Sequence, residues 1–182
     1  MTQENLTKPL NGAIMDVILS NTDDILTAGI EVAADIAVST GCQNGGLVLG
    51  FFDDEEDLIT FSRKFGNGVR EPDPEGRGPD DKGGNYISIA FSKILECIET
   101  GRNSGDDPDR PLRKGEYGYP GGIVIQTARG CLYIAYSGFP KGEDDKRVAW
   151  ACVWRIHTLC AELCDELDVI IVELGENGEE KL

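Results

Sequence analysis

The pattern of apolar and polar residues predicts a helix near the start of the chain and a β-hairpin directly after it. Between residues 22 and 38, apolar side chains recur every three or four positions, which is the spacing of an amphipathic helix. Asp23 and Asp24 suit the positively polarised N-terminal end of this helix. Two apolar runs follow, at residues 46–52 and 58–65, and the acidic residues 53–57 between them are typical of a turn. The apolar stripe of the helix comprises Ile25, Leu26, Gly29, Ile30, Ala33, Ala34 and Ala37.

The second half of the chain repeats this arrangement of a helix followed by a hairpin. Asn85 is a suitable N-cap and Gly101 a suitable C-terminal stop for a second helix. Residues 121–127 and 130–137 have the pattern of a second hairpin, with Ala128 and Arg129 near its turn. A long helix over about residues 143–166 and a last strand at residues 168–174 complete the pattern. The buried stripe of the second helix comprises Ile87, Ala90, Phe91, Ile94, Leu95 and Ile98.

Paired strands between helices predict an α+β fold, in contrast to the alternating strand–helix units of a parallel sheet. We expect an antiparallel sheet of about five strands flanked by helices. The chain has 182 residues, which suits a single domain. We therefore divide it into an N-terminal extension at residues 1–20, one α/β domain at residues 21–175 and an acidic tail at residues 176–182.

Two long loops interrupt the predicted elements, at residues 66–85 and 101–122. Together they hold 12 of the 23 glycines and 6 of the 8 prolines. Loops of this length in a compact domain are usually either functional or disordered, and the sequence leaves both readings open.

The last helix has an uncharged flank that predicts a contact with a second copy of the chain. This flank carries Trp150, Trp154, His157 and Ala161, beside a separate apolar stripe that should face the sheet. A helix that is apolar over so much of its circumference is deeply buried or is covered by a partner. We expect a homo-oligomer through this flank, because most soluble oligomers are symmetric assemblies of one chain. The alternative is that the loop at residues 101–122 packs over the tryptophans.

The charge of the chain disfavours some classes of partner and indicates where a small anion would bind. With 17 basic and 33 acidic residues, the formal net charge is −16, so binding to nucleic acid or to an anionic membrane is disfavoured. No apolar run is long enough to cross a membrane, and no secretory signal is recognisable, so we expect a cytoplasmic protein. Residues 63–114 contain 10 basic and 10 acidic residues, and this locally neutral segment is where a small anion would bind.

Familiar catalytic motifs are absent from the sequence. It contains no phosphate-binding loop, no dinucleotide fingerprint, no esterase elbow and no cysteine or histidine spacing of a zinc site. The six cysteines are expected to be free thiols. His157, the single histidine, is either packed for structural reasons or a weak candidate for ligating a metal or haem. Arg63 and Lys93 have side chains that bind carboxylates or phosphates, or that pair with neighbouring acids.

Several short motifs, in the right order over about residues 22–160, resemble the GlcG-like, haem-binding HbpS family, which also forms the C-terminal module of PduO-type proteins. The glycine pair Gly121 and Gly122, a hairpin that ends in Ser137 and Gly138, and an acidic helix start around Asp145 are similar to the C-terminal half of that family. The upstream matches are Arg63 with Gly66, Ile89 and Ala90 with Lys93, and the turn at Gly101 to Ser104. The chain departs from the family pattern at Val124, Leu132 and Ala135, and in the longer loop at residues 66–85.

The resemblance implies a profilin-like α/β sandwich, an oligomer, and a module that binds haem or a small carboxylate. It implies that Lys93 and Arg63 hold an acid or a haem propionate, that the glycine pair lets the backbone approach the ligand, and that Asp145 starts the last helix. Two alternatives remain. One is an enzyme acting on a small organic acid, with Lys93 as base or electrostatic stabiliser and Tyr117 or Tyr119 as proton donor. The other is a structural or regulatory oligomer without a ligand. The ligand-binding residues expected by this resemblance are Arg63, Lys93, Gly121, Gly122, Ser137 and Asp145.

Overall fold

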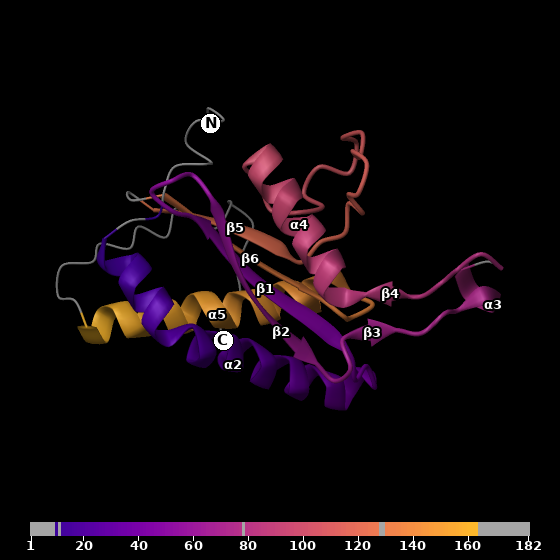
Figure 1. The fold of residues 1–182 in the computed structure, drawn as a ribbon. Helices are drawn as coiled ribbons and strands as arrows, with labels where there is room; N and C mark the ends of the chain where they lie inside the picture. The colour runs from indigo at the N-terminus through magenta and orange to yellow at the C-terminus, as the bar shows by residue number, and fades with distance from the viewer. Residues whose placement is uncertain (1–9, 11, 78, 128–129, 164–182) are drawn as a thin grey trace.

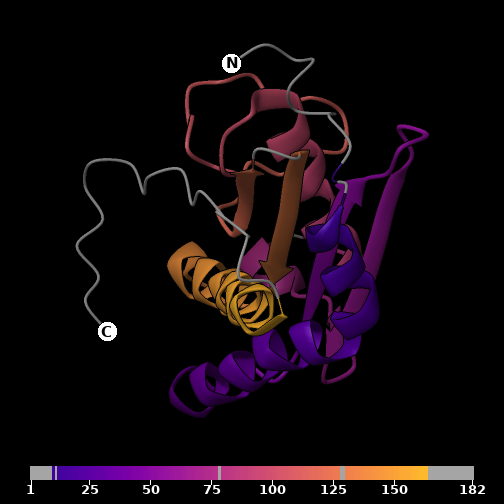
Figure 2. The same cartoon turned by 90° about the vertical axis from the view of Figure 1, so that its left-hand side faces the viewer.

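A four-stranded antiparallel sheet organises the chain, with two helices on one face and one helix on the other (Figures 1 and 2). The computed structural model describes residues 10, 12–77, 79–127 and 130–163. The strands are ordered β2-β1-β6-β5, and β1 (Gly45–Phe52) pairs with both β2 (Leu58–Phe65) and β6 (Gly130–Ser137). The outer strand β5 (Gly122–Thr127) pairs with β6. The α+β class and both hairpins are confirmed, whereas the strand expected at residues 168–174 lies outside the described residues.

The two faces of the sheet bury separate apolar layers, because side chains alternate along each strand. Leu47, Leu49 and Phe51 face α2 (Ala13–Thr40) and α5 (Gly142–Leu163) in the larger layer. Val48 faces the opposite way, toward α4 (Tyr86–Thr100), where it joins Tyr133 and Ala135 of β6. The central strand β1 is therefore buried on both faces, which explains why it is apolar at nearly every position.

Helix α4 has the ends that the sequence predicts. The Asn85 side chain accepts hydrogen bonds from the backbone N–H groups of Ile87 and Ser88, as an N-cap does. Gly101 ends the helix in the left-handed conformation, with a φ of 67° that favours glycine. These two residues fix the length of α4 and therefore the position of Lys93 along it.

The first helix is longer than the pattern predicts, because α2 begins at Ala13 instead of residue 22. It is kinked at Asn21, whose φ of −125° is not helical and whose side chain donates to the carbonyl of Val17. Ile14 and Ile18, on the N-terminal part, are buried in the larger apolar layer.

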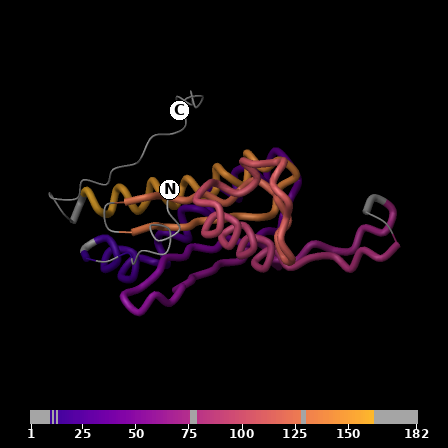
Figure 3. Tube along the Cα trace, turned by 90° about the horizontal axis from the view of Figure 1, so that it is seen from above, coloured from indigo at the N-terminus to yellow at the C-terminus, as the bar shows by residue number. Residues whose placement is uncertain are grey.

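The loop at residues 66–85 forms an arm that projects from the body of the molecule (Figures 1 and 3). It contains a two-stranded sheet of β3 (Val69–Arg70) and β4 (Gly84–Asn85), and a single helical turn, α3 (Pro74–Arg77). Arg70 and Asp81 hold the two sides of the arm together with two hydrogen bonds.

Membrane insertion of a helix finds no support in the part of the chain that the structure describes, since none of its helices combines the length and the apolar character needed to span a bilayer.

Candidate functional site

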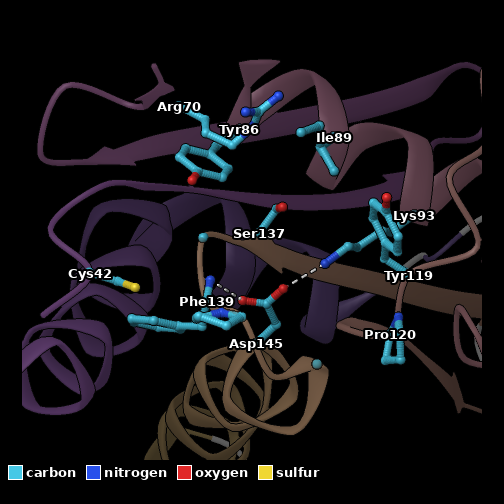
Figure 4. A pocket seen from close by; sticks show the side chains of 13 residues that line it. Cys42, Arg70, Tyr86, Ile89, Lys93, Tyr119, Pro120, Ser137, Phe139 and Asp145 are labelled. Carbon is cyan, nitrogen blue, oxygen red and sulfur yellow. Dashed lines mark hydrogen bonds and ion pairs between the residues drawn. The ribbon is translucent and has the colours of Figure 1, made fainter. Parts of the chain in front are cut away.

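A cavity of about 340 Å³ opens at the end of the sheet where β6 stops (Figure 4). Helix α4, the start of α5, the base of the arm and the end of the long loop at residues 101–122 surround it. Pro140 follows the end of β6, and a proline cannot continue the hydrogen-bonded ladder of a sheet. The chain therefore turns away there and leaves a space between the two faces. The lining residues are Cys42, Arg70, Tyr86, Ile89, Lys93, Tyr119, Pro120, Ser137, Gly138, Phe139, Pro140, Gly142 and Asp145.

A buried ion pair lies at the floor of this cavity. Lys93 Nζ donates to Asp145 Oδ2 at 2.7 Å and to the backbone carbonyl of Tyr136 at 2.7 Å. The other oxygen of Asp145 accepts from the backbone N–H of Phe139 at 3.0 Å. Lys93 is 1% exposed and Asp145 is 4% exposed. An ammonium has three donors, and two of them are used within the described residues.

Burial shifts both groups of the pair toward their neutral forms. Removal from water lowers the pKa of Lys93, although the Asp145 carboxylate beside it opposes this change. Removal from water raises the pKa of Asp145, and the Lys93 ammonium and backbone N–H donors oppose this. Each charge thus stabilises the opposite charge in the buried site. Lys93 Nζ nevertheless gives up its proton more readily than an exposed lysine does.

Ser137 presents a hydroxyl that the protein itself does not use. The residue is the last of β6 and is 6% exposed, yet its side chain forms no hydrogen bond with another described residue. Figure 4 shows the hydroxyl in the pocket, between the floor formed by Asp145 and the wall formed by Arg70 and Tyr86. Because this hydroxyl faces the cavity and has no partner among the described residues, it is available to a bound molecule or to water.

Arg70 brings a second cation to the mouth of the cavity from the base of the arm. Its guanidinium forms a two-pronged pair with Asp81, at 2.6 and 2.7 Å. The carboxylate of Asp81 also accepts from the backbone N–H groups of Asp73 and Gly83. The guanidinium and these N–H groups hold the pKa of Asp81 well below its usual range. Arg70 was not among the residues predicted from the sequence to bind a ligand. The signal that could have identified it is the placement of an arginine and an aspartate, Arg70 and Asp81, on either side of a turn.

The predicted glycine pair lies behind the ion pair and does not line the cavity. Gly121 has a φ of +121°, and a methyl group there would lie 2.6 Å from Asp145 Cβ and 2.7 Å from Lys93 Nζ. A methyl group at Gly122 would lie 2.9 Å from the Ser104 hydroxyl oxygen and 3.0 Å from Lys93 Cβ. These glycines let the start of β5 approach α4 and α5 closely, so they position Lys93 and Asp145.

Arg63 is not among the residues that line the cavity. It lies on β2 and pairs with Asp23 and Thr27 of α2. Its cross-strand neighbour is Leu47, which faces the layer of α2 and α5. Of the six residues expected to bind a ligand, the structure thus gathers Lys93, Ser137 and Asp145 in one pocket, with the two glycines behind them.

His157 does not contribute to the pocket either. It borders a separate apolar cavity of about 20 Å³, together with Ile125, Val153 and Ile156, and its ring contacts that of Trp154 edge-on. His157 is the only histidine of the chain, so the pocket does not fit a histidine-ligated haem. No cluster of three metal-ligating side chains occurs within residues that the structure describes.

No segment that the structure describes covers the flank of α5 at Trp154. Trp154 is 51% exposed, whereas Trp150 packs partly against the larger apolar layer. The loop at residues 101–122 lies on the α4 side of the sheet (Figure 1), so it does not pack over Trp154.

A second, more open groove of about 550 Å³ lies along the other end of α4. Three arginines line it, but each is paired with a carboxylate of the protein: Arg102 with Asp107, Arg110 with Glu116 and Arg113 with Glu99. In both places the cations are paired with carboxylates of the protein. The pocket around Lys93 is more enclosed and also holds the unused hydroxyl of Ser137, so we regard it as the stronger candidate site.

Comparison with known proteins gives a similarity of fold. No protein-family model matches the sequence, and no curated protein matches it. The structure is similar to that of a double mutant of HbpS from Streptomyces reticuli, with 16% identity, a TM-score of 0.44, and coverage of 72% of this chain and 84% of that one. A second HbpS crystal structure gives 17% identity, a TM-score of 0.43, and coverage of 78% and 88%. The expected resemblance to HbpS is therefore confirmed as a similarity of structure over most of the chain, at low sequence identity.

Proposed function

We propose that this chain is a binding module for a small carboxylate, which occupies the pocket at the end of the sheet. The observation that carries the proposal is that the unused hydroxyl of Ser137 and the buried ammonium of Lys93 line the same cavity. A carboxylate accepts hydrogen bonds and donates none, so it matches a hydroxyl and an ammonium, which both donate. Hydrogen bonds that involve a charged partner are the stronger kind.

Other features of the pocket support a small anion. Arg70, paired with Asp81, lies at the mouth. Gly142 places the N-terminal end of the 22-residue helix α5, whose first turn also carries three acidic residues, against the cavity. The volume of about 340 Å³ is near the lower end of the range for ligand pockets, which is roughly 300–1,000 Å³. Of the two ligand classes implied by the resemblance, a small carboxylate agrees with the small volume of this pocket, whereas haem ligated by histidine does not fit it, because the pocket holds no histidine.

Calorimetry with matched ligands tests the proposal. We expect lactate, a small carboxylate, to bind, and lactamide, in which the charge is removed, not to bind. Ser137→Ala should weaken lactate binding about tenfold, which corresponds to roughly 1.4 kcal/mol for one hydrogen bond to a charged group. The stability of the variant should be unchanged, because the hydroxyl has no partner among the described residues.

Two results would contradict the proposal. The first is that no member of a panel of small carboxylates binds. The second is that haem binds with one-to-one stoichiometry and a Soret band, and that Ser137→Ala and Lys93→Arg leave lactate binding unaltered. Haem would then be the ligand, held by residues other than those named here.

A further inference from the structure

Lys93 has the surroundings of a reactive amine. Its Nζ lies at the floor of the cavity, 2.7 Å from the carboxylate oxygen of Asp145 that can take its proton. Among the described residues, Lys93 is the only lysine that lines this cavity. We propose that Lys93 forms a Schiff base with the carbonyl carbon of a small oxo acid bound in the pocket. This inference rests on the proposed binding of a carboxylate and adds the chemical class of the ligand.

The environment of Lys93 favours the amine that such a reaction needs. Apolar side chains of Ile89, Pro120 and Phe139 line the cavity around it. The burial that lowers the pKa of Lys93 and raises that of Asp145 moves the proton toward the carboxylate. A lysine in a desolvated pocket is the kind that reacts with carbonyl compounds.

The groups that hold the carboxylate leave the carbonyl near Lys93. Figure 4 shows the Ser137 hydroxyl between Asp145 and the wall that Arg70 and Tyr86 form. A carboxylate bound to the Ser137 hydroxyl would place the adjacent carbon of a 2-oxo acid between Ser137 and the ion pair. The ligand class is therefore an acid whose carbonyl carbon is bonded directly to the carboxylate carbon.

The reaction balances with these groups alone. Nζ first passes a proton to Asp145, and its lone pair attacks the carbonyl carbon. A C–N bond forms, the π pair moves to oxygen, and a proton moves from nitrogen to that oxygen, which gives a neutral carbinolamine. Asp145 then protonates the hydroxyl, the C–O bond breaks, water leaves, and the nitrogen lone pair completes the C=N bond. One ammonium and one carbonyl thus give one iminium and one water, and Asp145 is again the carboxylate counter-ion.

A structural ion pair is the competing explanation, because the same contact joins α4 to α5. A purely structural pair makes no use of a cavity beside the amine or of the unused hydroxyl of Ser137. It also predicts that a carbonyl compound reacts with Lys93 no faster than with exposed lysines, and this difference can be measured.

Reductive trapping on the full chain distinguishes the two explanations. The protein is incubated with pyruvate and sodium cyanoborohydride, and the adduct is mapped by peptide mass spectrometry. We expect one adduct per chain, with the Lys93 peptide labelled several times more than those of the exposed Lys114 and Lys141, because burial lowers the pKa of Lys93. Lactate has a hydroxyl in place of the ketone of pyruvate, so it should give no adduct and should protect Lys93 from pyruvate.

Two variants, one at Lys93 and one at an exposed lysine, test where the adduct forms. Lys93→Arg keeps the charge and should abolish the adduct, whereas Lys114→Arg should not change it. Labelling that is equal at Lys93, Lys114 and Lys141, or absent at Lys93, overturns the inference, and this result comes from the unmodified chain even where Lys93→Arg fails to fold. Calorimetry without reductant separates the two claims: lactate binding without a pyruvate adduct removes only the Schiff base, and no binding at all removes the proposed function as well.

Discussion

Lys93 Nζ and Asp145 Oδ2 lie 2.7 Å apart, and this contact joins helices on opposite faces of the sheet. Lys93 belongs to α4 and Asp145 to the first turn of α5, so the pair closes around the end of β6. It is held there by the Tyr136 carbonyl on one side and the Phe139 N–H on the other. The floor of the pocket is therefore also a junction between the two apolar layers.

Loss of either partner of this pair should destabilise the fold. Lys93→Met or Asp145→Asn leaves one buried group without its counter-charge, and each should lower the free energy of unfolding by about 3–5 kcal/mol. The double variant should lose much less than the sum, because neither charge then remains buried. Urea unfolding of the four proteins measures this, with Lys64→Met, at an exposed position of β2, as control. Additive losses would mean that the two groups are not coupled.

The close approach of Gly121 to the ion pair gives a second prediction. Gly115 and Gly121 both have a positive φ, of +95° and +121°, but only at Gly121 would a methyl group meet other atoms. Gly115→Ala should therefore cost about 1 kcal/mol for the backbone conformation alone. Gly121→Ala should cost at least about 3 kcal/mol and should also weaken lactate binding, because the methyl group displaces Lys93 and Asp145. Equal effects of the two substitutions in thermal unfolding would contradict this placement of β5.

The arm should lose its internal support in acid. The pKa of Asp81 is lowered in the folded arm, so its contribution is present above the ordinary value for an aspartate, about 3.9, and is lost as the pH falls below it. A carbon-13 NMR titration should show the Asp81 carboxyl still ionised at pH values where an ordinary aspartate is protonated. Asp81→Asn should free Arg70 and alter the backbone N–H signals of Asp73 and Gly83 at neutral pH. An ordinary titration of Asp81 would mean that the pair with Arg70 does not form.

We also propose that a second copy of the chain covers the flank of α5 that contains Trp150, Trp154, His157 and Ala161. The exposed indole of Trp154 beside a flank without charge supports this. Light scattering should give a mass above that of one chain, and Trp154→Glu should reduce it to the 19.7 kDa of the monomer. Leu95→Glu, at a similarly exposed apolar position on α4, is the control and should leave the oligomer intact. A monomeric native protein would contradict the proposal.

Much of the fold follows from local sequence signals, but the composition of the pocket follows from them only in part. Asn85 and Gly101 mark both ends of α4, and the spacing of apolar residues marks both hairpins. The N-terminal part of α2 was not predicted, because Asn21 interrupts the helical conformation and breaks the pattern.

Some residues of the site could likewise be predicted from local sequence motifs, whereas the positions of others depend on the tertiary structure. Lys93, Ser137 and Asp145 were identified by motif resemblance, and they meet because the middle of α4, the end of β6 and the start of α5 converge. The sequence did not indicate that Arg70 lines the pocket and that Arg63 does not. The face on which Arg63 lies depends on its register with Leu47, and the position of Arg70 depends on how the arm folds back through Asp81.

The central claim is that the pocket at the end of the sheet binds a small carboxylate, and NMR titration of the full chain with lactate tests it most directly. Backbone amide shifts should saturate and should cluster at the residues around the cavity, above all Ser137, Gly138, Phe139 and Gly142. Ser137→Ala should shift the titration to about tenfold higher lactate. Shifts that are absent at high lactate, or that cluster instead around Arg102 and Arg113 in the groove at the other end of α4, would contradict the claim.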